Sequence, residues 1–215
     1  NFQYQADVER AVGRIAFDTP EEYAHYAQSV VQAERGDPPL ALPRRAAFFG
    51  TSNPDDKATA LSSEDLMLPL ADALGPTLDD ETWALETVRG EEATKARLGE
   101  LLGGPQTPAL LFTATHGAAF NWDDPFYPRH QGALVTQDWP GPRNWHQRFR
   151  EDFLFSGDDV GEDATLWGTV AVFFGCFGAG IPRTSDFHPL KASRAWDRLN
   201  LADKALLAPL PRRLL

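Results

Sequence analysis

Short apolar runs divide the chain at intervals that suit the strands of a buried sheet. They are RAAFFG (45–50), WALETV (83–88), PALLFTAT (108–115) and GTVAVFFG (168–175), with GALVTQ (132–137) as a fifth candidate. Runs of this length without polar alternation are typical of strands that are covered on both faces. The pattern therefore predicts a central sheet with buried strands.

Polar and apolar residues alternate with a helical period between the first three runs. The segments are SSEDLMLPLADAL (62–74) and EEATKARLGELLGG (91–104), the second of which ends in two glycines typical of a helix terminus. Strands that are joined through helices form right-handed crossovers and lie parallel to one another. We therefore predict an α/β fold with a mostly parallel central sheet and flanking helices.

The first 39 residues form a predicted extension to this domain. VGRIAF (12–17) has the composition of a short strand, and a helix is expected over 18–34 with Asp18 or Thr19 as its N-cap. A proline-rich loop separates this helix from the rest of the chain. We expect residues 40–215 to form a single domain that belongs to a larger protein.

Composition and charge exclude several classes of function. Asp and Glu number 31 against 20 Lys and Arg, and the net charge of −11 repels a phosphate backbone, so nucleic acid is not expected as a partner. No apolar stretch approaches the ~18 residues that span a bilayer, and the first residues lack the apolar core of a signal peptide. A single cysteine rules out an internal disulfide and suits a reducing compartment. The expected location is the cytoplasm, without a membrane partner.

A histidine and the only cysteine each come directly after a predicted strand. His116 and Gly117 come after the run 108–115, and Cys176 comes after the run 168–175. Because reactive groups in parallel sheets gather at the carboxyl ends of the strands, both side chains are expected at one edge. A Cys–His pair there suits nucleophilic catalysis, with the backbone amides of Gly117 and Cys176 as donors to an oxyanion.

Each of these residues also has a structural explanation. A lone cysteine after an apolar run is usually an inert core residue, and a single histidine at a strand end is usually structural. Their joint placement beside glycines favours catalysis. The order of His before Cys disfavours papain-like enzymes, in which the cysteine comes first.

The segments LLFTATHG, QGALVTQDWPG and FFGCFGAGIP together resemble the signature of caspases, metacaspases, gingipains, separase and bacterial CHAT domains. The similarity extends roughly over residues 40–190 and is greater to CHAT and gingipain-type peptidases than to animal caspases. It implies a caspase-like fold and a cysteine endopeptidase with His116 and Cys176 as its catalytic pair, without a metal or cofactor. Phe174 and Gly175 depart from the residues that precede the cysteine in caspases and metacaspases, so their specificity is not transferred.

The resemblance also concerns the region after the cysteine and the control of the enzyme. Domains of this clan continue into at least one further strand, and no such strand is evident here, so we expect the domain to be incomplete at its C-terminus. The rest is either truncated or provided by a second chain or small subunit that completes the sheet. Regulation by autoprocessing or by a sensor domain is implied by analogy. The pair Arg212–Arg213 is either a processing site or simply solvated.

Four aspartates are candidates for orienting the histidine or for binding a basic substrate side chain, although a place in a solvated loop is the more usual explanation for each. They are Asp123, Asp124, Asp138 and Asp186. A basic residue at P1 is expected from the acidic net charge and from the gingipain-like resemblance. Three tryptophans between the catalytic candidates are either walls for an extended peptide or parts of the core. They are Trp122, Trp139 and Trp145.

The remaining histidines are expected at the surface, because they lack the spacing of metal ligands. They include His130, His146 and His188. Two functions of different class stay open: an endopeptidase acting on proteins or peptides, and an inactive caspase-like scaffold that binds a partner. A nucleotide- or flavin-binding domain is disfavoured, since neither G-x-G-x-x-G after a strand nor a P-loop occurs.

Overall fold

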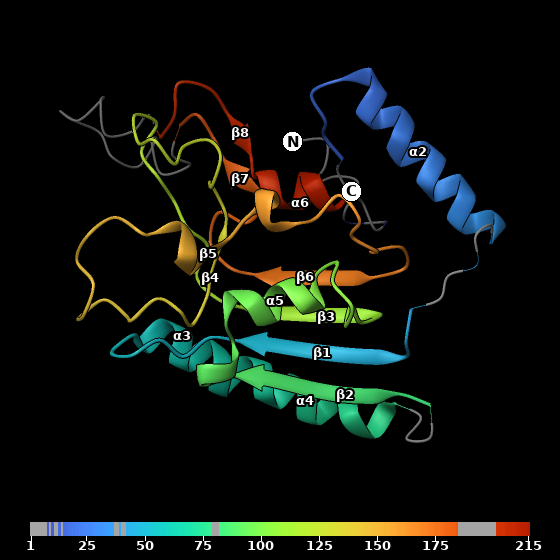
Figure 1. Ribbon diagram of the computed structural model, residues 1–215, viewed down its shortest axis with the longest axis horizontal. Coiled ribbons are helices and arrows are strands. Elements are labelled where there is room, and N and C mark those ends of the chain that lie inside the picture. Colours follow the sequence, from blue (N-terminus) through green and yellow to red (C-terminus); the bar gives the residue numbers. More distant parts are fainter. Residues whose placement is uncertain are drawn as a thin grey trace.

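The computed structural model describes residues 8, 10, 13, 15–36, 39, 42–78, 82–184 and 201–215. Its centre is a four-stranded sheet in the order β2-β1-β3-β6, and all three pairings are parallel (Figure 1). The strands are β1 (Arg45–Gly50), β2 (Ala84–Arg89), β3 (Leu110–Ala114) and β6 (Val170–Phe174). The predicted α/β fold with a parallel sheet and flanking helices is confirmed, as are four of the predicted strands.

One face of the sheet is covered by a continuous helical segment. It comprises α3 (Lys57–Leu61), the π-helical η1 (Ser62–Met67) and α4 (Leu68–Leu74), and it ends in the 3₁₀ turn η2 (Gly75–Thr77). Met67 and Ala71 pack on the side chains of Ala46 and Phe48. The helix predicted over 62–74 is therefore present and begins five residues earlier.

The opposite face is covered by α5 (Lys95–Leu101), which follows the 3₁₀ turn η3 (Gly90–Glu92). Leu98 and Leu101 share a core with Phe49 and Leu111, and all four are fully buried. Burying one such side chain contributes about 1.5–3 kcal/mol, so this core stabilises the packing of α5 on the sheet. The predicted helix over 91–104 is confirmed but is shorter than its sequence segment.

The candidate strand at 132–137 does not join the main sheet. Only β4 (Leu134–Val135) is extended there, and it pairs antiparallel with β5 (Leu154–Phe155) beyond the arrowheads of the main strands (Figure 1). The chain reverses after β3, so Val135 N–H donates to the carbonyl oxygen of His116 (2.8 Å) and cannot extend the parallel ladder. The 3₁₀ turns η4 (Glu151–Phe153) and η5 (Gly157–Asp159) flank β5.

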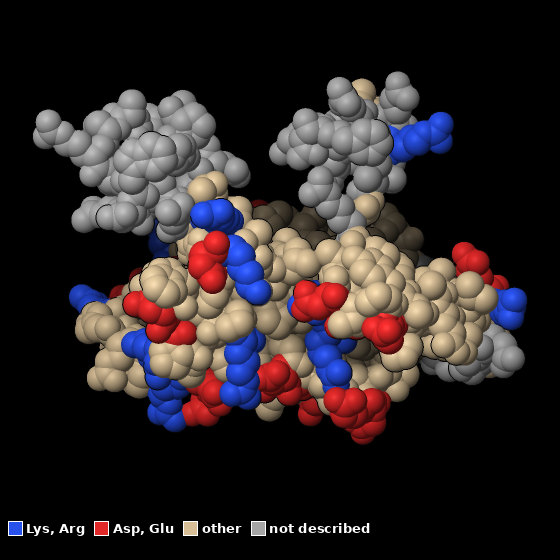
Figure 2. Space-filling model, turned by 90° about the horizontal axis from the view of Figure 1, so that it is seen from above, with Lys and Arg blue, Asp and Glu red and all other residues tan. Residues whose placement is uncertain are grey.

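The C-terminal part of the chain packs on the face of the sheet that α5 covers. It contains β7 (Gly180–Ile181), β8 (Leu206–Leu207) and α6 (Pro209–Leu214), and β7 pairs antiparallel with β8. Leu210 of α6 is buried in the same core as α5. On the face drawn in Figure 2, acidic and basic side chains are interspersed.

The N-terminal helix α2 (Pro20–Arg35) lies outside this core and projects from it (Figure 1). Thr19, one of the two predicted N-caps, caps this helix and forms a capping box with Glu22. The short strand predicted before it is wrong for residues 13 and 15–17, which are not in a sheet. Without a neighbouring strand, Phe17 packs instead on the ring of Tyr23 at 5.0 Å between centroids.

Candidate active site

His116 and Cys176 come after neighbouring parallel strands at equivalent positions. The last pair in the ladder is Ala114 with Phe174, and Thr115 N–H donates to the carbonyl oxygen of Phe174 at 3.2 Å. Each candidate therefore lies two residues beyond the same rung. The structure brings the two segments together at the carboxyl edge, where the sequence placed them.

The two segments touch through their backbones. A Cβ atom at Gly117 would overlap the carbonyl oxygen of Cys176, and a Cβ atom at Gly175 would lie 3.0 Å from the carbonyl oxygen of Thr115. Only glycine permits such a close approach at Gly117. The glycines beside the candidate residues thus have a direct structural reason.

Both candidate side chains are accessible. Cys176 is exposed, and the His116 side chain is 36% exposed. An inert structural cysteine is normally buried, whereas a reactive one is accessible and lies near a cationic or basic group. The exposure of Cys176 disagrees with the interpretation of this residue as part of the core.

Asp56 completes the arrangement, and it is not among the residues predicted from the sequence. Its Oδ2 lies 2.5 Å from Nε2 of His116, and only 9% of its side chain is exposed. Its other oxygen accepts the N–H of Ala58 at 3.0 Å, so the carboxylate also caps the start of α3. The same strand-end rule that located His116 would have found Asp56 after β1, had the adjacency of β1 and β3 been known.

This contact assigns different tasks to the two imidazole nitrogens. Nε2 of a neutral imidazole donates its hydrogen to the Asp56 carboxylate, and Nδ1 then has a free lone pair. A carboxylate in this place also stabilises the imidazolium that forms when Nδ1 accepts a proton. The pair can therefore act as a general base that is fixed in one tautomer.

The backbone donors predicted for an oxyanion lie at the same place. The hairpin after β3 is held by bonds from Ala118 N–H to the Ala133 oxygen and from Val135 N–H to the His116 oxygen. Gly117 forms an isolated β-bridge with Leu134 between these two hydrogen bonds. Neither hydrogen bond involves the N–H group of Gly117.

The residue after the cysteine has an unusual backbone. Phe177 adopts a φ of 58°, in the left-handed region that a bulky side chain rarely occupies. Its carbonyl oxygen accepts the N–H of Gly180 at 2.9 Å, which closes a tight turn directly after Cys176. Backbone of this kind is concentrated at functional sites, where the surrounding structure holds it in place.

Two of the predicted substrate-binding aspartates serve the local structure. Asp138 Oδ2 accepts the N–H of Lys95 (2.7 Å) at the start of α5 and the hydroxyl of Thr136 (2.8 Å). Asp124 Oδ1 accepts the N–H of Phe126 at 2.8 Å and lies 3.6 Å from Arg148. Asp123 is exposed in the loop after His116, and Asp186 lies outside the described residues.

The three tryptophans differ in their surroundings. Trp139 is buried, and its ring lies against His116 with 6.1 Å between centroids. Trp145 packs on Phe153 at 5.1 Å, while Trp122 is exposed. Of the three, Trp139 is therefore the one whose ring lies against His116.

The expectation that His130 lies at the surface is wrong. It is buried because the loop after β3 turns back on itself, so that its N–H donates to the Phe126 oxygen (2.8 Å) and its ring packs 4.9 Å from that of Phe126. Its Nε2 lies 3.3 Å from Glu151. His146 is exposed as expected, and His188 lies outside the described residues. Over the described part of the chain, no group of three His, Cys, Asp or Glu side chains is placed to hold a metal ion.

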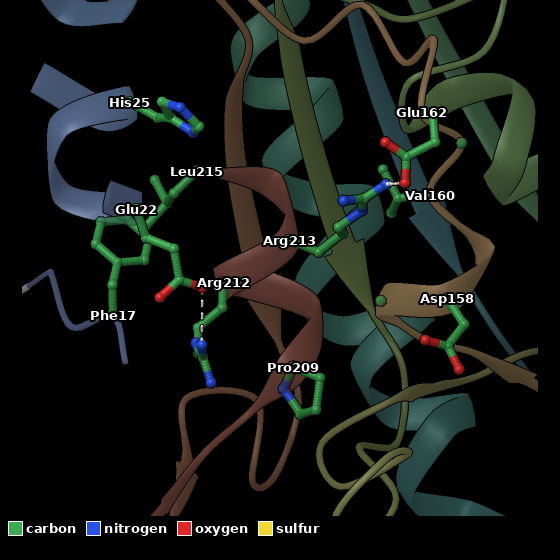
Figure 3. Close-up of a pocket in the computed structure, with 12 residues that line it drawn as sticks. Phe17, Glu22, His25, Asp158, Val160, Glu162, Pro209, Arg212, Arg213 and Leu215 are labelled. Carbon is green, nitrogen blue, oxygen red and sulfur yellow. Dashed lines mark hydrogen bonds and ion pairs between the residues drawn. The ribbon is translucent and has the colours of Figure 1, made fainter. Parts of the chain in front are cut away.

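A separate cavity of about 820 Å³ lies between α2, α6 and the turn η5 (Figure 3). Its arginines are already paired, Arg212 with Glu22 (3.2 Å) and Arg213 with Glu162 (2.5 Å). His116, Cys176 and Asp56 at the sheet edge do not line this cavity.

In the described ranges, no helix is long and apolar enough to cross a membrane.

Comparison with known proteins yields no relative. No family model matches the chain, and no match was found among curated proteins or solved structures. The function must therefore be inferred from the side chains themselves.

Proposed function

We propose that this protein is a cysteine endopeptidase with a caspase-like fold, in which Cys176 is the nucleophile and His116 the general base and acid. The observation that carries the proposal is the placement of an exposed thiol and an Asp56-bound imidazole at equivalent ends of adjacent parallel strands. The resemblance of the surrounding segments to caspase-like and gingipain-type peptidases supports the same conclusion.

The first half of the reaction forms a thioester. Nδ1 of His116 takes the thiol proton while Sγ of Cys176 attacks the scissile carbonyl carbon, and the carbonyl electron pair moves onto the oxygen. The N–H groups of Gly117 and Cys176 donate to this oxyanion, and one such donor contributes about 2.7–4 kcal/mol in related acyl transfers. The carbonyl then reforms, the C–N bond breaks, and the leaving amine takes the proton from His116.

The second half restores the enzyme. His116 removes a proton from a water molecule, whose oxygen attacks the thioester carbon. The tetrahedral intermediate expels the Cys176 sulfur, which recovers its proton from His116, and the carboxylic acid product leaves. Asp56 keeps the imidazole in one orientation throughout and balances the positive charge of its protonated form.

We also propose a preference for basic P1 residues and a partner that completes the sheet. Of the described candidate acids, Asp123 is exposed and close in sequence to His116, so it is the residue we assign to a basic side chain. Among the described residues, the edge strand β6 pairs only with β3, and it exposes the apolar side chains of Val170, Val172 and Phe174. Such an edge is a template for a further strand, which a second chain or small subunit would supply.

The test is cleavage of fluorogenic peptides that differ at P1, with and without native flanking sequence. We expect Cys176→Ala and His116→Ala to lower turnover by on the order of 10⁴-fold or more, and Asp56→Asn by about 10²- to 10⁴-fold. Peptides with Arg or Lys at P1 should be cleaved fastest.

The competing function is an inactive caspase-like scaffold that binds a partner. It is supported if every form of the protein leaves all peptides intact and the thiol also resists iodoacetamide. The exposed thiol and the paired imidazole argue against it, because a scaffold requires neither.

A further inference from the structure

A buried asparagine links the two segments that hold the His116 ring. Asn53 belongs to the loop between β1 and α3, and its side-chain amide donates to the carbonyl oxygens of Thr136 (3.1 Å) and Trp139 (2.8 Å). Asn53 is buried, so both bonds are shielded from water. Charge-neutral bonds of this kind fix geometry strongly when they are buried.

Further contacts tie the same two segments together. Ser52 N–H donates to Gln137 Oε1 at 2.8 Å, and Gln137 Nε2 donates back to the Ser52 oxygen at 2.9 Å. A Cβ atom at Gly141 would overlap the carbonyl oxygen of Pro54, so the two backbones are in direct contact there. The segment 136–141 is thus hydrogen-bonded to, or in contact with, each residue of the loop 52–54.

Each segment contributes one contact to His116. The loop after β1 supplies the Asp56 carboxylate to Nε2, and the segment 136–141 supplies the ring of Trp139, which meets the imidazole at 69°. A hydrogen bond at one nitrogen leaves the imidazole free to tilt about that bond. A buried indole against the ring restricts the tilt.

We propose that Asn53 and Trp139 are positioning residues for the His116–Asp56 pair, acting through its geometry without touching the substrate. The proposal rests on the proposed function, and its test includes a readout that does not depend on turnover. A displacement of about 1 Å at a catalytic group can lower a rate by about 10²-fold. The loss of either support should therefore affect kcat far more than KM.

The kinetic test uses Asn53→Ala and Trp139→Leu, with Trp139→Phe as the conservative variant. We expect kcat to fall about 10- to 100-fold in the first two, with KM within about 3-fold, and Trp139→Phe to recover most of the loss. The matched control is Thr107→Ala, which removes a buried side chain with two backbone bonds at the other end of β3, to Gly103 N–H (3.1 Å) and the Gly104 oxygen (2.7 Å). This control should retain the wild-type kcat.

A double-mutant cycle separates positioning from general loss of structure. When Asp56→Asn is already present, adding Asn53→Ala should lower kcat by a further factor of less than about 3. The reason is that the His116–Asp56 pair, which Asn53 positions, is already broken. An equal loss in both backgrounds, or an equal loss in Thr107→Ala, would overturn the proposal.

Nuclear magnetic resonance of the His116 imidazole tests the geometry even if no peptide is cleaved. A hydrogen-bonded Nε2–H resonance should be present in the wild-type protein and in Thr107→Ala, and lost or shifted in Asn53→Ala and Trp139→Leu. An unchanged resonance in both variants refutes the positioning role. Absence of turnover together with the expected resonances would instead refute the endopeptidase function alone.

Discussion

The carboxyl edge of the sheet and the corner between α2 and α6 both bring charged side chains together, but they do so by different means. At the edge, Asp56 contacts His116 because Asp56 comes after β1 and His116 after β3, and these two strands pair in parallel. At the corner, Glu22 meets Arg212 across a cavity, and α2 has no buried residue (Figure 3).

The difference shows which contacts can support chemistry. An exposed ion pair contributes about 0–1 kcal/mol and moves with its side chains, whereas a rung of a buried ladder moves only if the core moves. We therefore expect changes at the edge to affect activity strongly and changes at the corner to affect only the attachment of α2.

Among changes that leave the side chains of the proposed catalytic residues in place, the largest effect should come from Gly117→Ala. The new methyl group would overlap the carbonyl oxygen of Cys176, so the segments after β3 and β6 must move apart and the catalytic pair loses its geometry. Peptide turnover should fall by about 10²-fold or more. The control is Gly178→Ala, where the nearest atom to a new Cβ is 3.6 Å away and activity should persist. Equal activity in the two variants would contradict the proposed packing of the edge.

An intermediate effect is expected from Asp138→Ala, on stability alone. Its carboxylate binds the first N–H of α5, and the loss of a helix cap costs about 1 kcal/mol in the free energy of unfolding. Urea denaturation measures this cost, and the preference for P1 residues should stay the same. Asp123→Ala is the matched variant, which should reduce cleavage after Arg and Lys and leave stability unchanged. If Asp138→Ala instead reduced cleavage after Arg and Lys while Asp123→Ala did not, Asp138 would be the residue that binds the basic side chain.

The smallest effect should come from Glu22→Gln at the corner. Hydrogen bonds from the backbone of Thr19 and then Asp18, together with the Arg212 charge, lower the pKa of the Glu22 carboxyl. A lowered carboxyl pKa stabilises the folded form above the ordinary value of about 4.3 and loses that stabilisation as the pH falls through the lowered value. Hydrogen exchange of α2 should therefore speed up below about pH 4, relative to β3.

The same exchange measurement provides its own control. Glu22→Gln should already show faster α2 exchange at pH 7, because the amide cannot replace the charge that faces Arg212, while Glu21→Gln should resemble the wild-type protein. Turnover should be unchanged in both. Loss of turnover in Glu22→Gln would mean that the corner and the edge are coupled.

The sequence predicted the main strands, and the meeting of the His116 and Cys176 segments at one edge, because both depend on local pattern. Apolar runs mark strands that are buried on both faces, and the residues directly after such runs lie at one edge, which placed His116 beside Cys176. Asp56 could not be placed in this way, because the chain order of the strands does not reveal that β1 lies between β2 and β3. Residues 13, 15–17 and the segment 132–137 were overestimated as strands, since an extended segment also needs a partner in the ladder.

Alkylation of Cys176 by iodoacetamide tests the central claim most directly, because it is the only cysteine in the chain. The wild-type thiol should react at least about 10-fold faster at neutral pH than in His116→Ala, with Asp56→Asn between the two, since a paired imidazole takes up the thiol proton. Equally slow alkylation in all three proteins would contradict a Cys–His pair at this edge.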